Sequence, residues 1–168
     1  NALGETVFYE YDAQGNMINS TSPKCAYTQK TYDAQGNLLS TTDDNGNITR
    51  YQYDERNRVI RKVDALSGVT VYEYSAAGDL ISETNALGGK ITYTYDAYGN
   101  KTSKRDANGN YTTYTYDALG NMLSVVDALG NTTQYEYDAN SQLIRVTNAK
   151  NQSVHYGYDA LGRRTSVT

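Results

Sequence analysis

The stretch YTYDALGNMLSVVDALGN, residues 114–131, contains the pentapeptide D-A-L-G-N twice. Each copy suits a tight turn, because Asp caps backbone N–H groups, Ala is easily accommodated, and Gly enters the left-handed region of the backbone. Two tyrosines separated by one residue precede the first copy, and an aliphatic pair follows it. This period-two pattern is typical of β-strands. The stretch therefore predicts a β-hairpin closed by a three-residue loop with a glycine bulge.

The same unit recurs along the whole chain. Tyr-Asp begins at Tyr11 and returns at steps of 21 residues, with Tyr74-Ser75 as the one departure, and the chain has 168 residues. Such a period indicates a tandem repeat array. Because the chain does not begin with Met, we expect a fragment of a longer protein. We predict a single array with the repeat bounds 1–21, 22–42, 43–63, 64–84, 85–105, 106–126, 127–147 and 148–168.

Four positions define the repeat: its two tyrosines, the Asp that follows them, and the turn glycine. The spacing of the tyrosines puts both rings on one face of a strand. We expect all these residues to act structurally. They are Tyr9, Tyr11, Asp12, Gly15, Tyr32, Asp33, Gly36, Tyr51, Tyr53, Asp54, Tyr72, Tyr74, Gly78, Tyr93, Tyr95, Asp96, Gly99, Tyr114, Tyr116, Asp117, Gly120, Tyr135, Tyr137, Asp138, Tyr156, Tyr158, Asp159 and Gly162.

The turn positions carry further expectations. The glycine slot predicts a positive φ, also where Asn57 and Asn151 occupy it, since Asn tolerates that region. Pro23 stands in the Ala slot, where a φ near −65° is wanted. Leucine recurs at the third turn position, where a polar residue would suffice, so we predict that several of these side chains pack against a neighbouring layer. They are Leu3, Leu66, Leu87, Leu119, Leu129 and Leu161.

These patterns define the fold class. We predict an all-β protein with eight 21-residue hairpins in one long, curved antiparallel sheet, forming part of a spiral, tube or shell. Sheets of about sixteen strands rarely stay open and flat. Tyrosine strands should alternate with aliphatic strands and form favourable cross-strand pairs. The alternative is a parallel β-solenoid with one rung per repeat, but tight glycine-bulge turns favour antiparallel hairpins.

Composition and single residues restrict the function. A net charge of −4 and an isoelectric point near 4.9 argue against nucleic acid as a partner, and no apolar run is long enough to span a membrane. His155 occupies an outward slot and Cys25 a glycine slot, with no base nearby in sequence, so we expect no catalytic residue. Turn capping explains the aspartates, including Asp43 and Asp44, without calcium. We therefore predict no enzyme, metal or cofactor.

The units YDALGNMLSVVDALGN and YDAQGNLLSTTDDNGN resemble YD repeats, also called RHS repeats. This family includes Rhs polymorphic toxins, the C component of toxin complexes, wall-associated proteins and teneurins. The resemblance implies a hollow β-sheet shell, which encloses a C-terminal toxin in the toxin members. The self-cleaving segment of that family does not occur in these residues.

Two functional hypotheses follow from this resemblance. The first is a non-catalytic shell segment around a toxin or other cargo, in an exported bacterial protein that is secreted or at the cell surface. The alternative is an extracellular adhesion or filament-forming module that binds glycan or assembles end to end. The expected partners are neighbouring YD repeats of the same or another chain, an enclosed toxin cargo, and a glycan. Packing within the sheet is the simpler explanation of the tyrosines.

Overall fold

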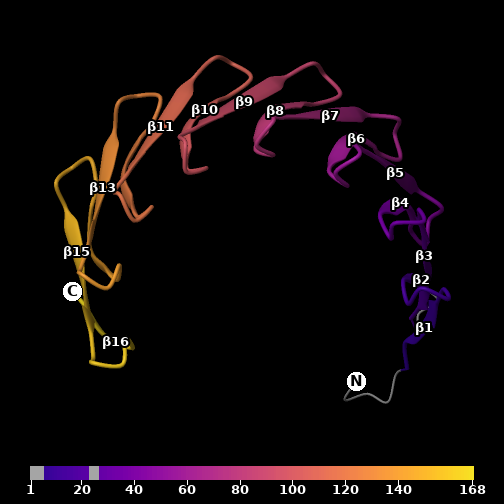
Figure 1. Ribbon diagram of the computed structural model, residues 1–168, viewed down its shortest axis with the longest axis horizontal. Coiled ribbons are helices and arrows are strands. Elements are labelled where there is room, and N and C mark those ends of the chain that lie inside the picture. Colours follow the sequence, from indigo (N-terminus) through magenta and orange to yellow (C-terminus); the bar gives the residue numbers. More distant parts are fainter. Residues whose placement is uncertain (1–5, 23–26) are drawn as a thin grey trace. The chain divides into compact units, whose positions relative to one another are not determined.

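The computed structural model describes residues 6–22 and 27–168, and every regular element in this part of the chain is a β-strand. Sixteen strands follow one another in a single sheet in chain order, as successive hairpins (Figure 1). Within the described ranges, no helix is long and apolar enough to cross a membrane. The strands are β1 Phe8–Tyr11, β2 Met17–Thr21, β3 Tyr27–Tyr32, β4 Leu38–Thr42, β5 Ile48–Tyr53, β6 Val59–Val63, β7 Val69–Tyr74, β8 Leu80–Thr84, β9 Lys90–Tyr95, β10 Lys101–Arg105, β11 Tyr111–Tyr116, β12 Met122–Val126, β13 Thr132–Tyr137, β14 Leu143–Thr147, β15 Ser153–Tyr158 and β16 Arg164–Val167.

Contacts divide the chain into two compact units, Asn1–Glu73 with Glu83–Gly88 and Tyr74–Ser82 with Gly89–Thr168. In the first unit, each strand from β1 to β7 pairs antiparallel with the next. In the second unit, the strands from β9 to β16 do the same. The predicted antiparallel hairpins are therefore confirmed, and the parallel solenoid is excluded.

In seven hairpins, all except β7–β8, the ladder contains a second irregularity beyond the turn. In the β5–β6 hairpin, Tyr51 faces Lys62 and Tyr53 faces Val59, so one residue more lies on β6 than on β5 between these pairs. This extra residue is a β-bulge, which strengthens the local twist. The second tyrosine thus pairs with the first residue of the aliphatic pair, and the second residue of that pair falls in the bulge. The predicted pairing of tyrosine with an aliphatic residue is confirmed, but the bulge was not predicted.

The sheet has no buried hydrophobic core in the residues that the structure describes, where Ser82 is the one fully buried side chain. Tyrosines and aliphatic residues shield one another along the sheet instead, mostly as half-buried side chains. Stability therefore rests on cross-strand pairs, turns and contacts between hairpins rather than on a second layer.

The prediction that turn leucines pack against a neighbouring layer is wrong for the described residues. The third turn position projects beyond the sheet edge, where the adjacent hairpin offers no surface to cover it. Tyr98 occupies the same position and is 89% exposed, whereas Leu3 lies outside the described residues. The exposed fractions of the leucines are Leu66 93%, Leu87 95%, Leu119 75%, Leu129 86% and Leu161 78%.

Candidate functional site: the tyrosine face and its turns

The turn that begins at Asp117 shows how the repeated pentapeptide closes a hairpin. The Gly120 N–H donates to the Asp117 carbonyl (3.1 Å), and the Asp117 N–H donates to the Asn121 carbonyl (2.9 Å). One carboxylate oxygen of Asp117 accepts from the N–H groups of Leu119 and Asn121, both at 2.9 Å. The other accepts from the Asn121 side-chain amide, at 2.9 Å. Both carboxylate oxygens of Asp117 are therefore engaged by its own turn.

These hydrogen bonds change the acidity of the turn aspartates. The side-chain amide of Asn121 is the main cause that lowers the pKa of Asp117 below its usual 3.8, and backbone N–H groups add to it. The Asn47 side chain does the same for Asp43. Each such carboxylate stays ionised to a more acidic pH because hydrogen bonds favour its charged form.

The acidic stretch that includes Asp43 and Asp44 gives no sign of a metal site. Asp43 accepts from the N–H groups of Asn45 and Asn47 and from the Asn47 side-chain amide, so both of its carboxylate oxygens already bind within the turn. In residues 6–22 and 27–168, no group of three or more His, Cys, Asp or Glu side chains is arranged to hold a metal ion.

The predicted left-handed glycines are confirmed in all ten described turns that carry one, where φ lies between +76° and +111°. Asn57 and Asn151 also have a φ of +59°, as predicted. Ser67 and Ser141, which were not among the predicted left-handed residues, adopt φ angles of +65° and +61° in the same slot. Their place in the 21-residue register would have identified them. Gly4, Pro23 and Cys25 lie outside the described residues.

The second tyrosine of the repeat joins neighbouring hairpins, a contact that the sequence analysis did not identify. The Tyr53 hydroxyl donates to the carbonyl of Leu38, fifteen residues earlier, at 2.9 Å. The β4–β5 ladder includes only Ser40, Thr41 and Thr42 on β4, so the Leu38 carbonyl lies beyond its end. The phenol therefore supplies the donor that the backbone ladder does not. The same bond, at 2.9 Å each time, joins Tyr32 to Met17, Tyr95 to Leu80, Tyr116 to Lys101, and Tyr158 to Leu143.

A sequence signal for this contact exists. All eight repeats keep Tyr at the second position, whereas the first position is Lys30 in the second repeat. Only a hydroxyl separates Tyr from Phe, so the constant choice of Tyr indicates a hydrogen bond. Burial raises the pKa of Tyr53 above 10.0, and it is also the main cause of the raised pKa of Tyr116.

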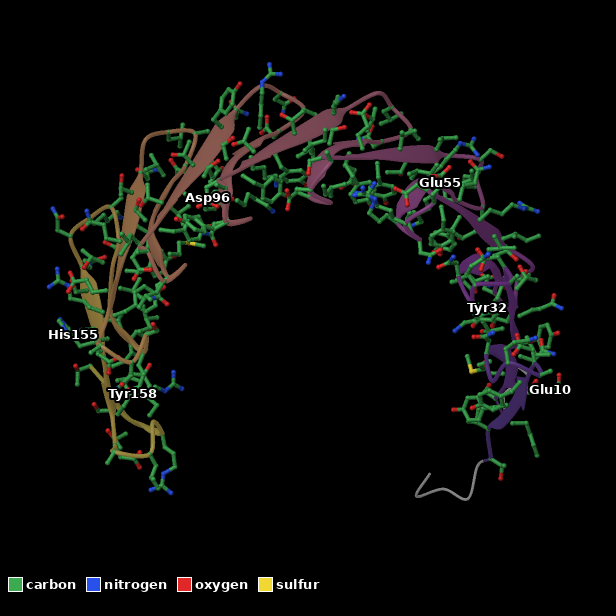
Figure 2. All side chains as sticks on the ribbon, viewed as in Figure 1. Glu10, Tyr32, Glu55, Asp96, His155 and Tyr158 are labelled. Carbon is green, nitrogen blue, oxygen red and sulfur yellow. The ribbon has the colours of Figure 1, made fainter. Side chains whose placement is uncertain are left out.

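The two faces of the sheet differ in chemistry. We call the side that carries both tyrosines of the repeat the tyrosine face. On the opposite face, hydroxyl groups and charges form cross-strand pairs, such as Thr115 with Ser124 at 2.7 Å and Arg145 with Glu136 at 2.9 Å. His155 lies on this opposite face, directly across from Arg145. Figure 2 shows His155 and Tyr158 on opposite sides of β15. The exposed imidazole beside a guanidinium is consistent with the expected solvated strand residue.

Adjacent turns at one edge leave solvent-open grooves between them. One groove in the first unit is lined by residues of the turns that begin at Asp33 and Asp54, together with Tyr51 and Tyr53. The Asn37 side-chain amide donates to the Asn57 side-chain oxygen across it, at 2.8 Å. In the second unit, Asn121 donates in the same way to the Ser141 hydroxyl at 3.0 Å. These contacts between turns reinforce the tyrosine hydrogen bonds between hairpins.

The sequence of these hairpin repeats matches a known protein family. Residues 2–135 match the teneurin YD-shell family. The chain belongs to this family. Residues 137–168 of this YD-shell chain match the RHS repeat. No curated protein sequence matches significantly.

Solved structures share the fold of this YD-shell chain at low sequence identity. The crystal structure of TcdB2-TccC3 without hypervariable C-terminal region has a TM-score of 0.79 and 18% identity, covering 97% of this chain and 10% of that one. For TcdB2-TccC3-Cdc42, the TM-score is 0.76 at 19% identity, covering 93% and 10%. For the Photorhabdus luminescens Tc holotoxin pore, it is 0.74 at 16% identity, covering 98% and 12%. The chain thus spans only 10 to 12% of these longer chains.

Proposed function

We propose that this chain is a wall segment of a YD-repeat shell that encapsulates a C-terminal toxin or other cargo in an exported bacterial protein, secreted or at the cell surface. Membership in the YD-shell family supports this, as does the likeness of its fold to Tc toxin structures. In this proposal, the eight 21-residue repeats are the building units, and their tyrosines, aspartates and glycines act structurally. The chain itself performs no chemistry.

The observation that carries the proposal is the tyrosine hydrogen bond between successive hairpins. It recurs with the same partner spacing of fifteen residues and the same length of 2.9 Å in both units. A contact that recurs in this way between successive hairpins lets a wall grow by the addition of repeats, since each repeat needs only its neighbour. A protein with an active centre would instead need one site that differs from its surroundings.

Limited proteolysis of the complete reading frame tests this proposal. We expect the region that follows the repeats to resist a broad-specificity protease while the sheet is folded. It should become sensitive in the denaturant range in which the sheet unfolds, followed by circular dichroism. The matched control is the same downstream region expressed without the repeats. Equal cleavage rates in the two proteins at zero denaturant would overturn the encapsulation proposal.

The second candidate is the extracellular adhesion or filament module, which the exposed turn tips favour. Five leucines and Tyr98 project from the sheet edges with at least three quarters of their surface exposed. Contiguous exposed apolar patches often mark contacts with other molecules, and a row of such tips along a sheet edge would supply one. Sedimentation velocity over a concentration series tests self-assembly, and a glycan array tests adhesion. A chain that stays monomeric and binds no glycan would contradict this candidate.

A further inference from the structure

The β9–β10 hairpin departs from its neighbours on the tyrosine face. Strand β10 reads KTSKR, whereas β12 of the next hairpin reads MLSVV. Lys101 faces Tyr95 and Lys104 faces Tyr93, so both lysines lie on the tyrosine face. The bulge between these pairs explains how two residues three positions apart share a face. In the next hairpin, Met122 and Val125 occupy the two equivalent positions.

Both lysines are half-buried, yet neither has a carboxylate partner in the described residues. The Lys101 ammonium lies 4.6 Å from the centre of the Tyr93 ring, which attracts it through the ring electrons. The cross-strand neighbours of Lys104 are Tyr93 and Thr112. Ion pairs elsewhere have their acid directly across the strand or within a turn, as Arg145 and Arg163 do.

We propose that Lys101 and Lys104, with the rings of Tyr93 and Tyr95, bind two carboxylates of an acidic polypeptide segment that lies on the tyrosine face. The lysines supply the positive charges, and the tyrosine rings supply apolar surface for the stems of the acidic side chains. A segment with two acidic side chains pointing to one side would place one carboxylate on each ammonium. Naming the enclosed cargo as the source of this segment rests on the proposed function.

The distribution of charge favours a short acidic peptide over a long polyanion. The turns at the two ends of β10 begin with Asp96 and Asp106, whose carboxylates stay ionised because hydrogen bonds lower their pKa values. The two lysines are at most about 10 Å apart along the strand, so they accommodate two carboxylates. A polyphosphate chain long enough to leave the patch along the strand would meet these aspartates, and the protein carries a net charge of −4.

Fluorescence anisotropy of the 168-residue chain with a labelled oligoglutamate peptide tests the site. The informative variant is Lys101→Met with Lys104→Val, which copies Met122 and Val125 of the next hairpin and should therefore keep the fold. The matched control is Arg50→Thr with Lys150→Asn, which removes two positive charges away from the tyrosine face. Circular dichroism verifies that both variants are folded.

We expect the unmodified chain to bind oligoglutamate, but not oligoglutamine, and to lose affinity as salt is raised. The paired lysine variant should bind at least about fivefold more weakly, while the control variant binds as the unmodified chain does. Equal affinity in the two variants, no binding by the unmodified chain, or tighter binding of oligophosphate than of oligoglutamate would overturn the inference. If the chain binds oligoglutamate but the downstream region is not protected from proteolysis, the shell proposal is refuted and the lysine site is not.

Discussion

Removing the hydroxyl of Tyr53 tests the contact on which the repeat array depends. Tyr53→Phe keeps the ring and deletes the 2.9 Å hydrogen bond to the Leu38 carbonyl. A hydrogen bond of this kind stabilises a protein by about 1 kcal/mol net, and a part-buried carbonyl left without a donor adds to the loss. We therefore expect a loss of about 1 to 2 kcal/mol in the free energy of unfolding. With a urea m-value of about 2 kcal/mol/M, the midpoint should fall by roughly 0.5 to 1 M.

The control for this experiment lies two residues earlier on the same strand. Tyr51 has its ring on the same face, but no hydrogen bond of its hydroxyl is found in the described part of the chain. Tyr51→Phe should therefore change the urea midpoint by less than about 0.2 M, as expected where no bond is lost. Tyr116→Phe and Tyr114→Phe repeat the comparison in the second unit, where Tyr116 donates to the Lys101 carbonyl. Equal shifts for the two tyrosines of either pair would refute the reasoning.

Three further predictions concern pH and the turns. The pKa of Asp117 is lower in the folded chain than the value of about 3.8 in the unfolded chain. Its ionised carboxylate therefore stabilises the fold above about pH 3.8, and this stabilisation is lost as pH falls through the folded-state pKa. The free energy of unfolding, measured over an acid pH series, should show this loss. Burial raises the pKa of Tyr116 above 10.0 in the folded chain. The contribution of its neutral hydroxyl to stability is therefore complete below about pH 10 and is lost as pH rises through the folded-state pKa. In Tyr116→Phe, the free energy of unfolding should fall less steeply at alkaline pH. Gly120 has a φ of +83°, so Gly120→Ala should destabilise the chain by about 1 kcal/mol. Gly120→Asn should cost less, because Asn tolerates this backbone and Asn57 already occupies the equivalent slot with a hydrogen bond to Asn37. Thermal unfolding of the two Gly120 variants distinguishes these outcomes, and equal melting temperatures would contradict the backbone argument.

Much of the fold could be predicted because its causes are local. A turn such as the one at Asp117 depends on the capping carboxylate and on a glycine that accepts a positive φ, and both are visible within five residues. The placement of Tyr51 and Tyr53 on one face follows from the alternation of side chains along a strand. Ser67 and Ser141 were missed because serine has no intrinsic preference for the left-handed region, and only their place in the repeat register identifies them.

The remaining features depend on which strands are neighbours and in which register they pair. The partner of the Tyr53 hydroxyl depends on β4 and β5 lying side by side, because the Leu38 carbonyl lies past the end of their ladder. The unpaired state of Lys101 and Lys104 likewise depends on the cross-strand register and on the bulge between them.

The sequence by itself determined the period, the antiparallel hairpins and the turn conformations, since each arises from interactions within a few residues. Only the tertiary structure decided that the turn leucines such as Leu129 lie exposed and that tyrosine hydroxyls join the hairpins. The physical reason is that burial and hydrogen-bond partners belong to neighbours fifteen or more residues away. A repeating pattern shows that such neighbours exist, but not which of their atoms meet.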